Sequence, residues 1–419
     1  MPIDQIELGR RIRRAREACA MTQEEVADRL GVSRAIVVQI EQGKRAVSGL
    51  ELQQLAYLFA RDIREFLAED FAEDDVVHAL FRSHEDVGED GVKQALRDCI
   101  ALGHELTSLE DLLGISRATV TVATYSHVIP RTRWEAIQVG EHVALEERRR
   151  LGLGSAPLGD VSSLLEAQGI RTGTVPMPDT VSGLMISHAK VGPFVVVNET
   201  HHAVRRRFSW CHEYAHVLLD TDTVGLVSRD KDRDDLREVR ANSFAANFLM
   251  PEEGVRQLIA SFGKGAESRV HAEIFDEAGV VPIDSRAEPG TQEIQLYDVI
   301  QMAHLYGISP LSALYRLRNL KLLTESEFER LKRMDSEGRS RTIGNLLGYP
   351  QLESIEQRGE FQRRFLSLGL EALRREKITQ SKFFELAERV NVPRLAAQGL
   401  LENAGIDDGE AQTVLLPER

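Results

Sequence analysis

Apolar positions near the amino terminus recur at helical spacing and are separated by polar caps and a glycine. One apolar stripe at this spacing consists of Leu8, Ile12 and Ala15. Thr22 followed by Glu25 is typical of a capping box at a helix start, and Gly31 ends that helix. Ser33 caps a third helix, and residues 50–59 continue as a fourth. The pattern predicts a bundle of short helices with one tight glycine turn.

The rest of the chain is expected to be helical except for one group of strands. β-branched runs predict strands at 170–175, 183–187 and 192–198. The expected fold class is therefore a mostly α multidomain protein with an α+β core, a five-helix amino-terminal domain and a helical carboxy-terminal region. A chain of 419 residues is expected to hold roughly two to four domains. We divide it into residues 1–67, 68–133, 134–332 and 333–419.

Charge changes the picture for the amino-terminal segment. The chain carries a net charge of −14, which argues against a protein that coats nucleic acid along its whole length. Residues 1–66 nevertheless hold 11 Lys+Arg against 10 Asp+Glu, so this segment is at +1 and the remainder is at −15. The basic residues cluster at Arg10, Arg11, Arg13, Arg14 and Arg16. The amino-terminal segment is therefore the part expected to meet DNA.

Composition also restricts the compartment. Hydrophobic residues make up 42% and charged residues 28%, which excludes disorder along the whole chain. The three cysteines are widely spaced, as is typical of a reduced protein without a disulfide framework. Apolar runs fall far short of the ~18–20 residues of a membrane helix, and no signal segment opens the chain. We expect a cytoplasmic protein with no membrane contact.

Four stretches in the amino-terminal segment combine into a specific motif. They are Leu8–Arg13, Thr22–Ala27, Leu30–Arg34 and Ile40–Arg45. Together they closely resemble the phage-repressor (Cro/C1, XRE-type) helix-turn-helix domain. The resemblance implies that the third helix enters the major groove of double-stranded operator DNA. A degenerate domain used only for protein contact is the alternative reading.

The resemblance also implies which side chains contact DNA. It places Arg34, Ala35 and Gln39 of the third helix at base edges and includes Ser33 among the DNA contacts. It assigns Lys44 and Arg45 to the phosphate backbone, and Gln23 both to a phosphate contact and to bracing the interface. The chemistry agrees, since Arg can bind guanine through two hydrogen bonds and Gln can bind adenine. Ala35 and Val38 depart from the polar residues that are frequent in this family, so readout is expected to involve a thymine methyl group or to be weak.

A second motif lies in the predicted α+β core. His212 and His216 are four residues apart, so on a helix both imidazoles lie on one face and can hold one metal ion. Glu213 lies beside them, where its carboxylate can take a proton from an activated water. With 12 His and 66 acidic residues in the chain, chance would supply ~0.05 His-acid-x-x-His matches.

A third ligand is required, because catalytic zinc sites have three protein ligands and one open position. Glu238 opens a further helix that ends before Pro251. Small residues at Ala241, Ala245 and Ala246 allow that helix to pack closely against the histidine helix. A glutamate on its inward face can then reach the metal.

These features resemble the ImmA/IrrE metallopeptidase family over about 190 residues. The resemblance is carried by Arg205–Ser209, the His212–His216 motif, Glu238–Pro251, Ile308–Pro310 and Ala313–Leu317. It implies a minimal zincin with His212, His216 and Glu238 as ligands of Zn²⁺, or of Mn²⁺, and Glu213 as general base. Tyr214 and Ala215 replace the commoner Leu-Gly inside the motif.

The resemblance implies a regulator that binds DNA and also cleaves a second, helix-turn-helix repressor protein, in stress response or in control of mobile elements. A different class of function stays open. In that alternative the chain is a non-enzymatic transcription factor whose zincin-like domain senses a ligand or a partner. The intact ligand set with Glu213 favours the enzyme, because a sensor has no need of a general base.

Several weaker signals have competing interpretations. Leu113–Ala118 echoes Leu30–Ala35, and a packing helix is favoured over a second helix-turn-helix. His201 and His202 are expected to be solvated rather than to line a cleft, and Cys211 is expected to be buried rather than a ligand. The strand ending at Asn198 could be an edge strand that pairs with a peptide, or an interior strand.

Composition and capping residues give an expectation for two further segments. The charged run 229–235 is expected to be a solvated loop. Residues 378–386 are expected to form a capped helix in the carboxy-terminal region, where dimerisation into a homodimer is one role that the region could have.

Overall fold

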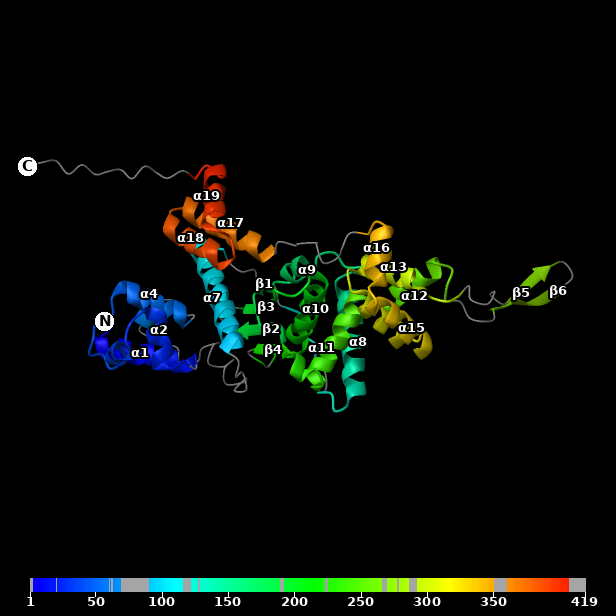
Figure 1. Cartoon of the computed structure of the whole chain (residues 1–419), viewed down its shortest axis with the longest axis horizontal. Helices are drawn as coiled ribbons and strands as arrows, with labels where there is room; N and C mark the ends of the chain where they lie inside the picture. The colour runs from blue at the N-terminus through cyan, green and yellow to red at the C-terminus, as the bar shows by residue number, and fades with distance from the viewer. Residues whose placement is uncertain are drawn as a thin grey trace, which may run out of the picture.

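The computed structural model describes residues 3–19, 21–59, 61, 63–68, 90–115, 122–126, 129–188, 192–221, 223, 225–265, 270–276, 279–285, 292–349 and 360–406. The chain is mostly helical with one small mixed sheet, which confirms the expected fold class. Figure 1 shows the amino-terminal helices at one end and the sheet in the middle of the molecule. No helix in these ranges is long and apolar enough to cross a bilayer.

Five short helices form the amino-terminal domain, as predicted. They are α1 (Gln5–Ala18), α2 (Gln23–Leu30), α3 (Arg34–Glu41), α4 (Gly49–Leu58) and α5 (Ile63–Leu67). Thr22 and Glu25 form the expected capping box, and Gly31 adopts a φ of 66° that ends α2. Ile12, Val26 and Val37 lie in the buried core of the bundle.

The middle of the chain contains helices around a four-stranded sheet. In chain order the elements are α8 (Arg133–Arg150), α9 (Val161–Ala167), β1 (Arg171–Val175), β2 (Val181–His188), β3 (Gly192–Asn198), α10 (Ala203–Leu219), β4 (Gly225–Arg229), η1 (Asp230–Asp232), α11 (Leu236–Leu249) and α12 (Glu252–Ser261). A separate antiparallel pair consists of β5 (Val270–Asp276) and β6 (Gly279–Ser285).

Strand order places β3 inside the sheet. The order is β1-β3-β2-β4, with β3 parallel to β1 and antiparallel to β2, and with β4 antiparallel to β2. Both sides of β3 are therefore paired, and the edge-strand interpretation of the strand ending at Asn198 is wrong. The edges are β1 and β4.

The two faces of the sheet are covered by different parts of the chain. Val195 and Val197 of β3 face the core that includes α10 and α11, whereas Phe194 and Val196 face the opposite way, as period-two alternation requires. On that second side the sheet packs against α7 (Asp90–Leu113) and α17 (Glu360–Arg374). The apolar stripe of α7 consists of Leu102, Leu106, Leu109 and Leu113.

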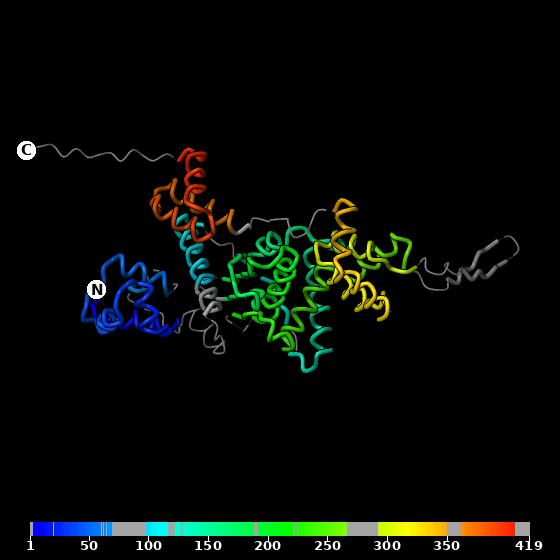
Figure 2. The backbone as a smooth tube through the Cα atoms, viewed as in Figure 1, coloured from blue at the N-terminus to red at the C-terminus, as the bar shows by residue number. Residues whose placement is uncertain are grey.

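The carboxy-terminal part is helical. Its elements are α13 (Leu296–Tyr306), α14 (Pro310–Asn319), α15 (Glu325–Ser336), α16 (Arg339–Leu346), α17, α18 (Gln380–Arg389) and α19 (Arg394–Asn403). The hydroxyl of Thr379 caps α18 by accepting from Lys382 N, so the predicted capped helix is present. Figure 2 shows α17, α18 and α19 on the same side of the core as the amino-terminal domain. The guanidinium of Arg389 lies 4.1 Å from the ring centre of Tyr57, which joins α18 to α4.

One buried carboxylate joins three segments that are distant in sequence. Glu110 of α7 is 1% exposed and accepts hydrogen bonds from Arg171 of β1 and Arg364 of α17. Gly114 ends α7 with a φ of 67°. The predicted echo Leu113–Ala118 therefore begins at the end of a long helix, and its last residues lie outside the described ranges.

Candidate functional site

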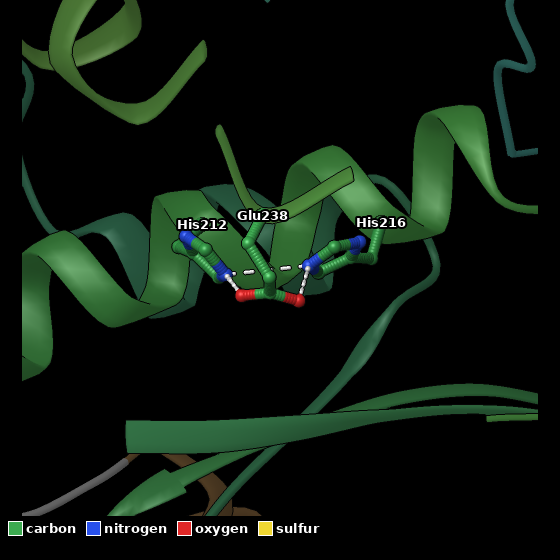
Figure 3. Close-up of side chains that lie close together, drawn as sticks. All are labelled: His212, His216 and Glu238. Carbon is green, nitrogen blue, oxygen red and sulfur yellow. Dashed lines mark hydrogen bonds and ion pairs between the residues drawn. The ribbon is translucent and has the colours of Figure 1, made fainter. Parts of the chain in front are cut away.

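The two histidines of the motif lie one turn apart on α10 and point the same way. Their Nε2 atoms are 3.2 Å apart, and the side chains are 5% and 0% exposed at His212 and His216. Glu238 reaches them from α11. Its Oε2 lies 3.1 Å from His212 Nε2, and its Oε1 lies 3.4 Å from His216 Nε2 (Figure 3). The structure thus brings together the three residues predicted as ligands.

Close packing of α10 and α11 makes this meeting possible. Ala241 and Ala245 are fully buried at the contact, so the two helix backbones can approach. Tyr214 of α10 makes edge contacts with Phe244 and Phe248 of α11, with ring centres 5.8 Å apart in both cases. These contacts fix the rotation of α11 that turns Glu238 toward the histidines.

The donor set fits a divalent metal ion. Two imidazoles and a carboxylate match the ligand chemistry of zinc, and also that of manganese. The donor atoms are separated by 3.1–3.4 Å. A tetrahedral site with bonds of ~2.0–2.1 Å has donor separations of about 3.3 Å, so the spacing is that of a coordination sphere.

A second layer of hydrogen bonds orients the ligands. His212 Nδ1 is 3.0 Å from Asn242 Oδ1, and His216 Nδ1 is 2.8 Å from Asp220 Oδ2. Asp220 is itself held by Arg240, whose Nη2 donates to both carboxylate oxygens at 2.7 Å. With Nδ1 occupied in this way, each histidine presents Nε2 to the metal position. These partners were not predicted from the sequence, although Asp220 is four residues after His216 on the same helix face.

Electrostatics at the site favour a positive charge. Burial by itself lowers the pKa of His216, but hydrogen bonds to Asp220 and Glu238 outweigh it and raise that pKa to about 10. Burial raises the pKa of Glu238, and the two histidines reverse this effect and hold the pKa well below its usual range. The surroundings that retain a proton on the imidazole also favour a bound cation.

Glu213 lies beside the donors in a pocket prepared by a glycine. The residue is fully buried, and neither carboxylate oxygen has a hydrogen-bond partner among the described residues. A Cβ at Gly183 of β2 would lie 2.9 Å from Glu213 Oε1, so the absence of a side chain there makes room for the carboxylate. Burial raises the pKa of Glu213, and the nearby His212 and His216 partly offset the rise. Sequence analysis gave no role to Gly183.

The remaining candidates in this region have different outcomes. His202 is exposed, as expected. His201 is only 4% exposed, so its predicted solvation is wrong; its Nε2 lies 3.2 Å from the Asp179 carbonyl oxygen and 3.4 Å from Asn198 Nδ2. The prediction that Cys211 is buried is confirmed, since it is 0% exposed. The exposed 3-10 turn η1 occupies part of the charged run 229–235.

The predicted DNA-contacting residues of α3 and of its N-cap position are exposed. Ser33, Arg34, Ala35 and Gln39 are all exposed. Ser33 is the residue before α3, but its side chain makes no capping hydrogen bond, so the hydroxyl is free for another partner. The orientation is compatible with major-groove contacts, and the individual contacts stay predictions.

The predicted phosphate-contacting residues are held to different degrees. Lys44 is exposed, whereas Arg45 is half-buried and pairs with Glu51 at 2.8 Å. Gln23 donates from Nε2 to Glu41 Oε2 at 2.9 Å, which provides the expected brace between α2 and α3. Glu41 also pairs with Arg16 of α1, with 2.6 Å between Glu41 Oε1 and Arg16 Nε.

Fold and site together define a DNA-binding helix-turn-helix domain joined to a metallopeptidase-type domain. Comparison with family models gives the same answer. Residues 12–66 match the family described as helix-turn-helix, and residues 165–318 match the IrrE N-terminal-like domain of the peptidases. The predicted fusion of these two families is thereby confirmed. Each match lies within the predicted segment, 1–67 or 134–332.

Whole-chain comparisons add little. No curated protein matches the sequence significantly. Among solved structures, ComR from Streptococcus suis aligns over 96% of both chains with 10% sequence identity and a TM-score of 0.15. That score is too low to support an argument about fold or function.

Proposed function

We propose that this protein is a DNA-binding regulator that is also a metal-dependent endopeptidase and cleaves a second regulator. The observation that carries the proposal is the arrangement of His212, His216 and Glu238 at metal-binding separations, with the carboxylate of Glu213 buried beside them. The helix-turn-helix domain supports binding of operator DNA. The peptidase family supports a protein substrate.

Each side chain of the site has a distinct task in this proposal. His212, His216 and Glu238 would hold Zn²⁺, or Mn²⁺, and Asn242 and Asp220 orient the two imidazoles. A metal ion held there would supply Lewis-acid activation of water and of the scissile carbonyl. Glu213 accepts the proton of the attacking water at a carboxylate oxygen and returns it to the leaving amine.

The substrate and setting follow from the family resemblance. We infer that the substrate is a helix-turn-helix repressor and that cleavage operates in the cytoplasm during stress response or in control of mobile elements. We keep the four segments 1–67, 68–133, 134–332 and 333–419 as the proposed domain division. The helices of residues 333–419 are the part that we assign to interaction, including formation of a homodimer.

A specific observation favours the second candidate, a metal-containing sensor without peptidase activity. The ligands are at most 8% exposed, so the site as it stands offers a substrate little access. In that reading the metal holds α10 and α11 together, and Glu213 has no chemical task.

The variant Glu213→Gln separates the two candidates. It keeps the size of the side chain and removes the basic carboxylate, so bound metal should persist while cleavage falls by orders of magnitude. Glu253→Gln is the matched control, because Glu253 is an exposed glutamate of the neighbouring helix α12. Metal content is measured on the purified proteins, and protein levels in cells are followed by immunoblot after stress. If the Glu213→Gln strain has a normal transcriptional response and no protein is more abundant in it than in the wild type, the peptidase proposal is wrong and the sensor is the remaining candidate.

A further inference from the structure

A hollow lies next to the candidate metal site and shares Asn242 with it. It is a cleft of about 610 Å³ between α8, α11, α12 and the end of α14. Figure 1 shows α8 and α11 side by side, and the two helices are in extensive contact. The volume falls within the range of ~300–1,000 Å³ that small-molecule sites occupy.

The charge of this cleft is opposite to that of the protein. Five cationic side chains line it: Arg133, Arg233, Arg256, Arg316 and Lys321. Three carboxylates oppose them. Glu141 and Glu252 line the cleft, and Glu252 pairs with Arg256 at 2.7 Å. Asp234 pairs with Arg133 at 3.0 Å and with Arg233 at 3.7 Å. A surplus of positive charge therefore gathers here on a chain whose net charge is −14.

Arg316 is the buried member of this group of positive charges. The residue is only 6% exposed and has no carboxylate partner within ion-pair distance among the described residues. Its Nε donates to the Met250 carbonyl at 2.9 Å and its Nη2 to Asn247 Oδ1 at 2.7 Å, at the end of α11. Nη1 has no partner in the described part of the chain. Burial lowers the pKa of this guanidinium, which is the cost of keeping a charge away from water.

We infer that this cleft binds a phosphate-bearing small molecule, with Arg316 at its base and Arg256 and Lys321 at its rim. A phosphate monoester carries a charge of about −1.5 to −2 at neutral pH, which matches the cationic surplus. The guanidinium presents several donors in a planar fork that suits phosphate oxygens. Apolar atoms of Ile137, Val239 and Leu320 line the same cleft and suit the organic part of the ligand.

The location connects this site to the metal centre. Asn242 lines the cleft and also bonds to His212 Nδ1 at 3.0 Å. A ligand in the cleft would therefore lie against the residue that orients one of the proposed metal ligands. The inference itself does not depend on peptidase activity, since binding is measured directly.

The test uses the full chain, with inorganic phosphate and AMP as probes and adenosine as the phosphate-free control. Calorimetry should show binding of phosphate in the millimolar range, tighter binding of AMP, and no binding of adenosine. The double variant Arg256→Gln/Lys321→Gln should weaken AMP binding by about tenfold or more, since it removes two charged donors to the phosphate group. The matched control Arg330→Gln/Arg374→Gln removes two exposed cations elsewhere and should bind normally.

Two further arms identify the site and the ligand class. His212→Ala should still bind AMP, and loss of binding in that variant would assign the phosphate to the metal centre and overturn the inference. Hexaglutamate should not compete with AMP. The inference also fails if neither probe binds at about 10 mM, if the double variant binds as tightly as its control, or if hexaglutamate binds and the two phosphates do not.

Discussion

The glycine beneath Glu213 gives the sharpest single-residue prediction. Gly183 lies on β2, paired with β3 on one side and β4 on the other. An added Cβ would meet the Val196 carbonyl oxygen at 2.8 Å and Glu213 Oε1 at 2.9 Å. Real Cβ atoms rarely approach closer than 3.4 Å, so the Gly183→Ala change must move both the β3 backbone and the carboxylate.

The magnitudes follow from these distances. Overpacking of a buried site costs ~1–3 kcal/mol, and the rigid backbone contact places Gly183→Ala in the upper half of that range. Relief of the contact with Glu213 requires a shift of about 0.5 Å. A misplacement of ~1 Å can cost ~100-fold in rate, so we expect cleavage to slow by roughly tenfold. The proposed metal ligands lie on α10 and α11, and metal content should not change.

Urea unfolding of the full chain, metal analysis and cleavage of a repressor substrate measure the three effects. Gly159→Ala is the matched control, because a Cβ at this exposed position has no heavy atom within 4 Å. Its free energy of unfolding should change by no more than ~0.5 kcal/mol. If Gly183→Ala and Gly159→Ala unfold at the same urea concentration, the reasoning about the pocket is refuted. Lost metal in Gly183→Ala would show that the substitution acts on the ligands instead.

Four other substitutions probe the remaining contacts. Glu238→Ala should lose most bound zinc, because one of three ligands is removed, and full zinc occupancy would contradict the ligand assignment. Asp220→Asn should keep the fold but weaken metal binding by ~10–100-fold, measured by chelator competition, and an unchanged affinity would show that the hydrogen bond to His216 is not needed. Arg34→Ala should weaken binding to operator DNA by ~1–3 kcal/mol and relax base preference at one position. Lys44→Ala should instead weaken binding to all DNA sequences and reduce the salt dependence of binding. If Arg34→Ala and Lys44→Ala each weaken binding to operator DNA and to random DNA by the same factor, α3 does not lie in the groove.

Local geometry explains which parts of the metal centre could be predicted. His212 and His216 are joined by helix geometry alone, so their spacing is sufficient to place both imidazoles together. Glu238 comes from another helix, but small residues at Ala241 and Ala245 indicated that the two helices approach closely. In each case the signal lies within one turn or one helix face.

Non-local structure explains what was missed. The role of Gly183 depends on where β2 lies under α10, which strand alternation does not specify. The interior position of β3 likewise depends on strand order, because a buried run is compatible with an edge or a centre. His201 was expected to be solvated because loops commonly are. In the structure the loop folds onto Asp179 and Asn198, which enclose the ring.

The residues that cover the second face of the sheet determine which fragments of this chain can fold on their own. Phe194 and Val196 belong to the same buried cluster as the leucines of α7, which precedes the peptidase segment, and Phe365 of α17, which follows it. Glu110 of α7 connects them further, because it accepts hydrogen bonds from Arg171 of β1 and from Arg364 of α17. A fragment excised at 134–332 would keep every ligand and uncover an apolar layer, so it should aggregate on expression. A fragment that folds on its own must therefore include α7 and α17 as well as the segment 134–332 that carries the candidate site. These two helices lie before and after that segment in the sequence.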